Sequence, residues 1–250
     1  MDVYRTLKVY TGGICRTITF GEATTETEFR DIYHLRYIVY SKKEYIDKDK
    51  YKDNLEKDIY DENGSCHYFI AKTDNKLIGV IRIITSDPLP TEKSFSFVEP
   101  KEILNIPRSR RAELGRFIIV PPDKENGIYF PRGLVMLFLL DTLSSFGLKN
   151  KILGGYAFVK KSLERKMEKR GLPFGKISTY HQIYPRDGVL YSYFTQKDDP
   201  VVPIYFLTQK FLDYSENRIR NSFMFKNING CDYVLRNNIY TTFLKYLRII

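Results

Sequence analysis

The amino-acid sequence predicts an α/β fold of the α+β type, in which helices flank a mixed, mostly antiparallel sheet. Two strand patterns, residues 67–71 and 77–84, are joined by five polar residues and predict an antiparallel hairpin. A third strand pattern at 112–120 leads to an apolar helical stretch at 132–145. A strand followed by a helix occupies residues 151–170. This order of elements is typical of a sheet with helices packed on its faces.

The elements near the two ends of the chain are predicted from shorter patterns. Residues 14–20 alternate as a strand does, and Thr25 with Glu28 has the spacing of a capping box at the start of a helix. Two short strands, near 176–183 and 189–195, are expected to form a terminal hairpin.

Composition indicates a soluble globular protein. The chain has 250 residues, of which 43% are hydrophobic and 28% charged, so disorder on compositional grounds is not expected. The longest uninterrupted apolar run, 134–140, is far shorter than the ~20 residues that cross a bilayer. Cys15, Cys66 and Cys231 are widely spaced and are expected to be free thiols. These features predict a cytoplasmic protein without a transmembrane segment.

The net charge of +10 is unevenly distributed. Residues 1–148 hold 22 basic and 22 acidic side chains, whereas residues 149–250 hold 18 and 8. The excess is explained either by a solvated basic surface or by a face that meets an acidic partner. Charge alone does not choose between a nucleic acid, an anionic membrane and an acidic protein.

Charged residues interrupt two apolar strand patterns. Arg82 shares a strand face with Ile78 and Val80, and a buried guanidinium needs partners. Glu113 and Arg116 flank a glycine, Gly115, in a second apolar strand. A bulge at this glycine would free a backbone amide as a donor to an oxyanion, although a structural Glu–Arg pair is the other explanation.

An acidic set, Glu56, Asp58 and Asp61, supplies carboxylates for these arginines and for Arg36. Alone it would be a solvated loop. Together with Glu113, the acidic set and the three arginines could hold the ammonium and carboxylate of a zwitterion in a cleft.

In order along the chain, these residues resemble the signature of the autoinducer (acyl-homoserine-lactone) synthases and of their relatives, the N-acyl amino acid synthases. The resemblance covers residues 30–120, and the later Gly171-Leu-Pro-Phe favours the second branch. The residues that carry the resemblance are Arg36, Tyr40, Glu56, Asp58, Asp61, Arg82, Phe95 or Phe97, Glu113, Arg116 and Phe117.

The resemblance implies a GNAT-type fold, which we assign to residues 1–198. Residues 199–250 lie outside the resemblance, and their own pattern predicts a helical extension packed on this domain. The resemblance also implies acyl carrier protein as the donor, a phosphopantetheine-linked acyl thioester as the donor substrate, and a small amine as the acceptor. Arg36, Tyr40, the acidic set, Arg82, Arg116 and Phe117 would bind the acceptor. Ordinary acetyl-CoA users of the fold carry a glycine-rich phosphate loop after the central strand, and residues 121–127 lack it.

The implied reaction is attack of an amine on a thioester. Glu113 is the candidate base, and a backbone amide near Gly115 is the candidate oxyanion donor. The leaving thiol, with a pKa of about 8.5, needs little acid assistance. The implied reaction needs no bound cofactor. No metal is expected either, and His34, His67 and His181, which stand apart from one another, do not suggest one.

Two further regions are assigned roles. Leu134, Leu137 and Phe138 are candidates to line an acyl tunnel, or else simply to form the core. The basic helix after the 151–159 strand is the candidate docking surface for the carrier protein, through Lys161, Arg165, Lys166, Lys169 and Arg170.

Three alternatives remain open at this stage. A homoserine-lactone synthase that uses S-adenosylmethionine is the closest, although the chain lacks the tryptophan that those synthases usually carry after the first helix. An acetyl-CoA-dependent acetyltransferase is disfavoured by the missing phosphate loop. A basic module that binds nucleic acid would explain the charge, but no nucleic-acid motif is visible.

Overall fold

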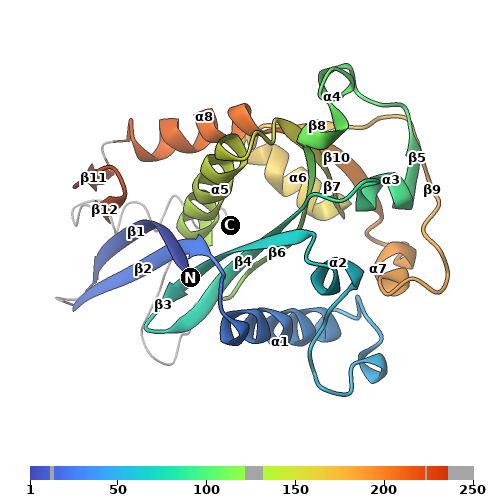
Figure 1. Cartoon of the computed structure of the whole chain (residues 1–250), viewed down its shortest axis with the longest axis horizontal. Coiled ribbons are helices and arrows are strands. Elements are labelled where there is room, and N and C mark those ends of the chain that lie inside the picture. The colour runs from blue at the N-terminus through green and yellow to red at the C-terminus, as the bar shows by residue number, and fades with distance from the viewer. Residues whose placement is uncertain (12–13, 122–131, 223, 236–250) are drawn as a thin grey trace.

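A single large sheet organises the molecule (Figure 1). The computed structural model describes residues 1–11, 14–121, 132–222 and 224–235. The ten strands of the sheet lie in the order β11-β12-β1-β2-β3-β4-β6-β7-β10-β8. Their bounds are β1 Asp2–Thr11, β2 Ile14–Glu22, β3 Cys66–Thr73, β4 Lys76–Ile84, β6 Arg111–Ile119, β7 Gly154–Lys160, β8 Phe174–Lys176, β10 Val201–Leu207, β11 Phe225–Asn227 and β12 Asp232–Leu235.

Helices cover both faces of this sheet. The long helix α5 packs on one face, and α1 lies on the opposite face (Figure 1). The helices are α1 Glu26–Lys42, α2 Ile59–Glu62, α3 Pro90–Ser94, α4 Lys101–Leu104, α5 Arg132–Lys149, α6 Lys161–Lys169, α7 Tyr191–Thr195 and α8 Thr208–Ile219. Neighbouring strands are antiparallel except for two pairs, β1 with β12 and β6 with β7. The mixed, mostly antiparallel α/β fold predicted from the sequence is therefore confirmed.

Helix α1 begins where the capping box predicted. The Thr25 side chain accepts a hydrogen bond from the Glu28 backbone amide, and the Glu28 carboxylate accepts one in return from the Thr25 amide. Ile32, Arg36 and Tyr40 follow Glu28 at intervals of four and are all buried. Because residues four apart lie on one helix face, this stripe carries an arginine directly onto the sheet.

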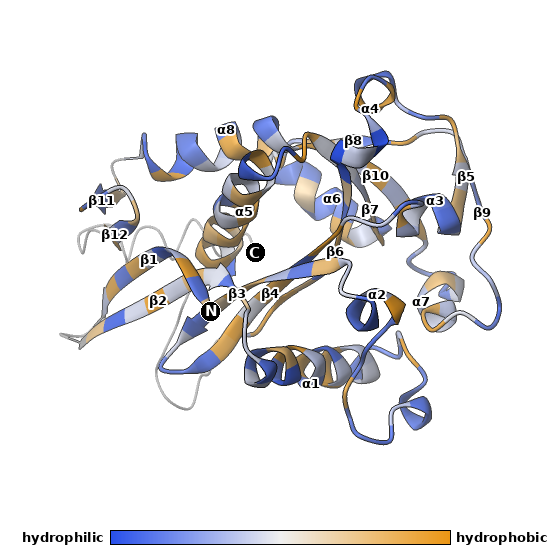
Figure 2. Ribbon diagram, in the orientation of Figure 1, coloured by the Kyte–Doolittle hydropathy of each residue, from blue (hydrophilic) through white to orange (hydrophobic). Residues whose placement is uncertain are grey.

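Helix α5 is almost wholly buried and supplies the core on its face of the sheet. Val135 and Leu139 lie against Gly79 of β4, where a side-chain carbon would meet them at 2.9 and 3.0 Å. A glycine at this point lets the helix approach the strand closely. In Figure 2 hydrophobic colour runs along α5 and the strands beside it, whereas α8 is largely hydrophilic.

The predicted hairpin is formed by β3 and β4. Thr73 pairs with Lys76, which leaves Asp74 and Asn75 as the two turn residues. Both have positive φ, 48° and 60°, as a type I′ turn requires.

The terminal hairpin predicted near 176–183 and 189–195 does not form. Strand β9, Tyr180–Gln182, pairs with β5, Phe95–Phe97, in a separate two-stranded sheet. Residues 191–195 are the helix α7. Phe194 of this helix stacks on Tyr184, with ring centroids 4.1 Å apart.

The prediction of a helical extension is wrong for residues 201–207. These residues form β10, which lies inside the large sheet between β7 and β8. Their apolar sequence, rich in β-branched and aromatic residues, suits a strand that is buried on both faces. The expected helix is α8, and β12 returns to pair with β1. A domain boundary at residue 198 remains a proposal.

None of the helices in the described part of the chain is long and apolar enough to span a membrane. Cys15, Cys66 and Cys231 are free, as expected.

Candidate active site

Strand β6 contains a bulge one residue beyond the glycine at which the sequence predicted it. Arg116 and Phe117 together lie opposite the single residue Ile81 of β4. Arg116 has a φ of 54°, a left-handed conformation that a non-glycine residue adopts at a cost. Gly115 itself stays in register with Arg82. A side-chain carbon at Gly115 would meet nothing within 4 Å, so space is open beside this residue.

Next to the bulge, β6 separates from its parallel neighbour. The two strands pair only from Arg111 to Glu113 on β6 and from Gly154 to Tyr156 on β7. Beyond Glu113, β6 continues with β4 as its partner and β7 continues with β10. The strands therefore diverge at Glu113, and the bulge lies at the start of the divergence.

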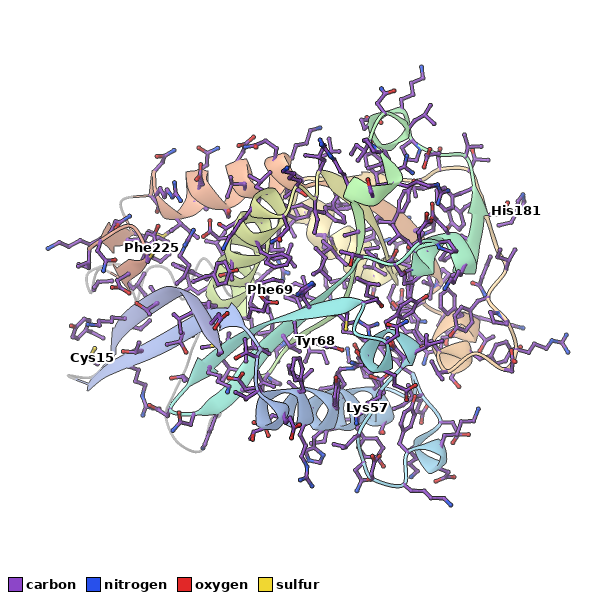
Figure 3. The ribbon with its side chains drawn as sticks, viewed as in Figure 1. Cys15, Lys57, Tyr68, Phe69, His181 and Phe225 are labelled. Carbon is purple, nitrogen blue, oxygen red and sulfur yellow. The ribbon has the colours of Figure 1, made fainter. Side chains whose placement is uncertain are left out.

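Strand register places the charged residues on one face of the sheet. Arg82 pairs with Gly115 and also with Tyr68 of β3, while Glu113 pairs with Tyr156. Directly paired residues point to the same face. This is the face that α1 covers, as Figure 3 shows for Tyr68, whereas Phe69 lies on the side of α5.

Three arginines and three carboxylates form a buried ionic cluster on this face. From here on, "the ionic cluster" denotes Arg36, Glu56, Asp58, Asp61, Arg82 and Arg116. Arg36 is fully buried and donates to Glu56, to Asp61 Oδ2 at 2.9 Å and to the Tyr68 hydroxyl. Tyr68 in turn donates to Asp61 Oδ1 at 2.6 Å.

The other two arginines share Asp58. Arg82 donates two hydrogen bonds to Asp58, from Nη1 to Oδ1 and from Nη2 to Oδ2, each at 2.8 Å. Its Nη1 atom also donates to Asp61 Oδ1 at 2.9 Å. The Arg116 Nη2 atom donates to Asp58 Oδ2 at 2.8 Å and to Glu56 Oε1 at 2.9 Å. Bidentate and shared contacts of this kind fix the position of each guanidinium.

The cluster is electrically self-compensating. Burial opposes ionisation of Asp58, but the guanidiniums of Arg82 and Arg116 outweigh it and hold the pKa of Asp58 well below its usual range. Burial likewise opposes ionisation of Asp61, yet Arg36 and Arg82 lower its pKa. The charges of the three arginines and the three carboxylates sum to zero. The arginines that the sequence left unmatched are therefore matched to carboxylates inside the protein.

Glu113 lies outside the ionic cluster. Its carboxyl group accepts hydrogen bonds from the Thr91 amide at 3.1 Å and the Thr91 hydroxyl at 2.7 Å. Burial raises its pKa to about 8, although the bonds from Thr91 and the charge of Arg82 act in the opposite direction. A buried carboxyl with such a pKa can exchange a proton near neutral pH, as a general base must.

The structure brings together most of the predicted site residues. The Tyr40 ring lies beneath the Arg116 guanidinium, with the ring centroid 5.3 Å away. Phe117 is the exception, because it packs against the core on the α5 side. Sequence reasoning missed Tyr68 and Thr91. Tyr68 could have been found, since the hairpin places it opposite Arg82, whereas Thr91 lies in a proline-rich segment with no readable pattern.

The proposed tunnel and docking residues lie elsewhere. Phe138 stacks on Phe20 and also contacts Phe225 and Tyr233, in the core near β1 and β2. Leu134 and Leu137 are buried in the same core. On α6 the side chains of Arg165, Lys166 and Lys169 are exposed, whereas Lys161 pairs with Glu164 and Arg170 is half-buried. Except for residue 121, the loop at 121–127 lies outside the described residues.

Residues 31–146, which contain the whole ionic cluster and Glu113, match the model of a family described as N-acyl amino acid synthase FeeM. The protein is an N-acyltransferase. The match begins inside α1 and ends inside α5, so it covers the elements that build the site. It confirms the resemblance that the ordered residues predicted.

Solved structures share the fold of this N-acyltransferase. One is FeeM, an N-acyl amino acid synthase from uncultured soil microbes, with 15% identity and a TM-score of 0.51 over 78% of this chain and 93% of that chain. Another is MesI, a CoA-dependent acyl-homoserine lactone synthase, with 16% identity and a TM-score of 0.51 over 79% and 93%. No curated protein sequence matches the chain.

Proposed function

We propose that this N-acyltransferase moves a fatty acyl group from the phosphopantetheine thioester of acyl carrier protein to the amine of an amino acid or a similar small molecule, in the cytoplasm. The observation that carries the proposal is the buried Glu113 carboxyl, with its pKa raised to about 8, at the point where β6 and β7 diverge. The ionic cluster beside it and the match of residues 31–146 add support.

Glu113 acts as the base in this proposal. Because burial raises the pKa of the Glu113 carboxyl to about 8, the proton of the acceptor ammonium passes to it at a smaller cost than to an ordinary carboxylate. The neutral amine nitrogen then attacks the thioester carbonyl carbon and forms a C–N bond. When the tetrahedral intermediate collapses, the C–S bond breaks and the thiol leaves. Its pKa of about 8.5 makes it a good leaving group.

The bulge supplies the oxyanion site. A backbone amide near Gly115, where β6 leaves its regular register, donates to the oxygen that gains charge in the intermediate. The open space beside Gly115 gives the thioester room to lie against the strand backbone. A larger side chain at this position would occupy that space.

The ionic cluster shapes the acceptor side. Arg36 and Glu56 have no exposed surface, so their role is to hold the other members in place. The side chains of Arg82, Asp58 and Arg116 keep small exposed fractions, and Arg82 on β4 and Arg116 on β6 lie close to Glu113 along the strands. With Tyr40, these three side chains form the wall against which the acceptor binds, and Asp61, whose side chain is fully buried, helps to hold them in place.

The donor enters between the diverging strands. A phosphopantetheine arm is narrow and amide-bearing, and it can pair with strand backbone that has no neighbour. The exposed cations of α6, Arg165, Lys166 and Lys169, attract an acidic carrier protein to this side.

The test is a product screen. The protein is incubated with acyl carrier protein loaded with acyl groups of several lengths and with a pool of amino acids and other amines, and product masses are read. A new N-acyl amino acid that depends on Glu113 supports the proposal. Parallel reactions with acyl-CoA decide between the two donors.

An acyl-homoserine-lactone synthase is the second candidate. It is favoured by the likeness to MesI, whose TM-score equals that for FeeM. The fold does not separate the two activities, because both relatives share it. Incubation with S-adenosylmethionine as the sole acceptor, followed by the product mass, separates them.

A further inference from the structure

A lysine is buried at the end of β7, on the same face as the candidate active site. Lys160 is 4% exposed, and its ammonium donates to the Tyr193 carbonyl oxygen. The Nζ atom also lies over two aromatic rings, 4.5 Å from the centroid of Tyr193 and 5.6 Å from that of Tyr45. These rings touch each other edge to face at 4.8 Å. The ammonium therefore lies in a pocket of two tyrosines and one carbonyl.

The charge of Lys160 has no carboxylate partner among the described residues. The other buried basic side chains there are all ion-paired: Arg5 with Asp141, Arg111 with Glu99, and the three arginines of the ionic cluster with their acids. Asp199 is close enough to stabilise the ammonium, but both its oxygens accept hydrogen bonds from Ser162. An ammonium has three donors, and Lys160 uses one of them within the described protein.

Register places Lys160 with the reacting groups. Tyr156, Phe158 and Lys160 alternate along β7 and share a face, and Tyr156 is paired with Glu113. Between Tyr156 and Lys160 the strand runs along the open side of the divergence, where β6 is no longer its neighbour.

A chain of aromatic contacts joins Lys160 to the ionic cluster. Its ammonium lies over Tyr45, the Tyr45 ring is 6.1 Å from that of Tyr40, and the Tyr40 ring lies beneath Arg116. Lys160 and the cluster thus border one region on the face that α1 covers.

The buried charges on this face do not balance without a ligand. The ionic cluster is neutral, and Glu113 is largely protonated below its pKa of about 8. The ammonium of Lys160 is then one uncompensated positive charge on this face, and its burial lowers its pKa. An amino acid whose amine has given up its proton carries one negative charge, on its carboxylate. Such a ligand would complete the balance.

We propose that Lys160 binds the carboxylate of the amino-acid acceptor and makes the enzyme select acceptors that carry an acid group. This inference rests on the proposed function, because it assigns the acceptor class of the same site. The tyrosine rings and the Tyr193 carbonyl hold the ammonium in position, and in the proposal its remaining donors bind the acceptor carboxylate.

Binding tests the inference without turnover. The probes are N-decanoylglycine and N-decanoylglycinamide, which differ only in the acid group, and their affinities are measured by isothermal titration calorimetry. Wild-type protein is expected to bind the acid about 10- to 100-fold more tightly than the amide, as for a charge-assisted hydrogen bond. Lys160→Met should remove this preference and leave the affinity for the amide nearly unchanged, whereas Lys160→Arg should retain part of it.

Lys210→Met, a change at an exposed lysine of α8, is the matched control and should behave as wild type. Equal affinity of the wild type for acid and amide, or binding of neither, overturns the inference. A Lys160→Met protein that keeps the preference for the acid also overturns it. If Lys160→Met lowers the affinities for the acid and the amide equally, the lysine has a structural role and the inference is likewise overturned. Absence of any N-acyl product in the turnover screen, with the acid preference present, would refute the proposed reaction and leave the carboxylate site standing.

Discussion

At the scale of single residues, the pKa values of the buried carboxyl groups in the site are shifted in opposite directions. In the ionic cluster each buried carboxylate meets guanidinium groups and stays ionised, as the lowered pKa of Asp58 indicates. Among the described residues, Glu113 accepts hydrogen bonds from the hydroxyl and the amide of Thr91 and forms no ion pair, so burial dominates and its pKa rises to about 8. The ionised carboxylates of the ionic cluster and the proton-exchanging Glu113 therefore lie on the same sheet face, and their different partners decide which of them stays ionised.

Replacing Glu113 by glutamine is expected to reduce turnover by about 10²–10⁴-fold, because an amide keeps the shape of the carboxyl group but accepts no proton. In the wild type, kcat/KM should rise with pH through about 8, as the carboxyl ionises, and the variant should lose this rise. Steady-state rates from pH 6 to 9.5 measure both effects. Glu62→Gln, at an exposed position of α2, is the control. An unchanged pH profile in Glu113→Gln would remove Glu113 from the mechanism.

The same group makes stability depend on pH. The pKa of Glu113 is about 8 in the folded protein, whereas an ordinary glutamate in the unfolded chain has a pKa of 4.5, so between these pH values the folded state holds a proton that the unfolded state has lost. Stability should then fall as pH rises from 4.5 through 8, by up to about 1.4 kcal/mol per pH unit from this group. Urea unfolding at pH 6 and 8 should show a smaller fall for Glu113→Gln. An equal fall in both proteins contradicts the raised pKa.

The ionic cluster should show strong pairwise coupling. Arg82→Met or Asp58→Asn alone leaves the buried cluster with one uncompensated charge, at a cost of about 3–5 kcal/mol in the free energy of unfolding. The double variant should cost much less than the sum, which urea unfolding of the four proteins would show. Arg108 and Asp87, which pair at 2.8 Å with both side chains more than half exposed, provide the control cycle. That cycle should give about 0–1 kcal/mol, and similar values in the two cycles would rule out a shared buried cluster.

At the scale of elements, the divergence of β6 from β7 creates the site. A parallel pair that continued to Lys160 would close the space beside Gly115 and bury the bulge inside the sheet. Helix α1 brings Arg36 and Tyr40 to the same face on a stripe of period four, and the short helix α2 offers Asp58 and Asp61 from its first turn. Two helices therefore bring their side chains to one face of β4 and β6.

Helix α6 follows β7 and carries the docking prediction. Reversing Arg165, Lys166 and Lys169 to glutamate should raise the apparent KM for acyl carrier protein and weaken its salt dependence, with turnover at saturating donor nearly unchanged. These three side chains are exposed, so folding should be unaffected. The KM for acyl-pantetheine, which has no carrier protein, is the internal control. If the KM for the carrier protein does not move, the carrier docks elsewhere.

At the scale of the whole molecule, the last part of the chain supplies strands that complete the large sheet. Strand β10 enters between β7 and β8, and β12 adds to the far edge beside β1. Both sides of the sheet therefore depend on residues after 198.

A fragment of residues 1–198 should consequently fail to fold cooperatively. Without β10, the antiparallel partner of β7 along all seven of its residues is missing, and β8 loses the strand to which it pairs. An exposed, apolar β7 edge favours aggregation. Size-exclusion chromatography and thermal unfolding of the fragment beside the full chain would test this. A monomeric fragment with a sharp transition would restore residue 198 as a domain boundary.

The sequence by itself determined the elements whose signals are local. The capping box at Thr25, the turn at Asp74-Asn75 and the apolar helix α5 depend on neighbouring residues, and all three form as predicted. The order of charged residues also predicted the resemblance that the family model matches over residues 31–146, because charges inside apolar strands are costly and so rarely accidental.

Tertiary structure alone decided the pairings between distant segments. The bulge lies at Arg116 and not at Gly115 because register with β4 sets it, and local sequence does not. Glu113 stands apart from the ionic cluster because its carboxyl group accepts a hydrogen bond from the hydroxyl of Thr91, 22 residues earlier in the chain. Strand β10 and the tyrosine pocket of Lys160 likewise arise from contacts between residues far apart in the chain. Burial and pairing of charge are properties of the assembled sheet, and they determine which of these side chains can react.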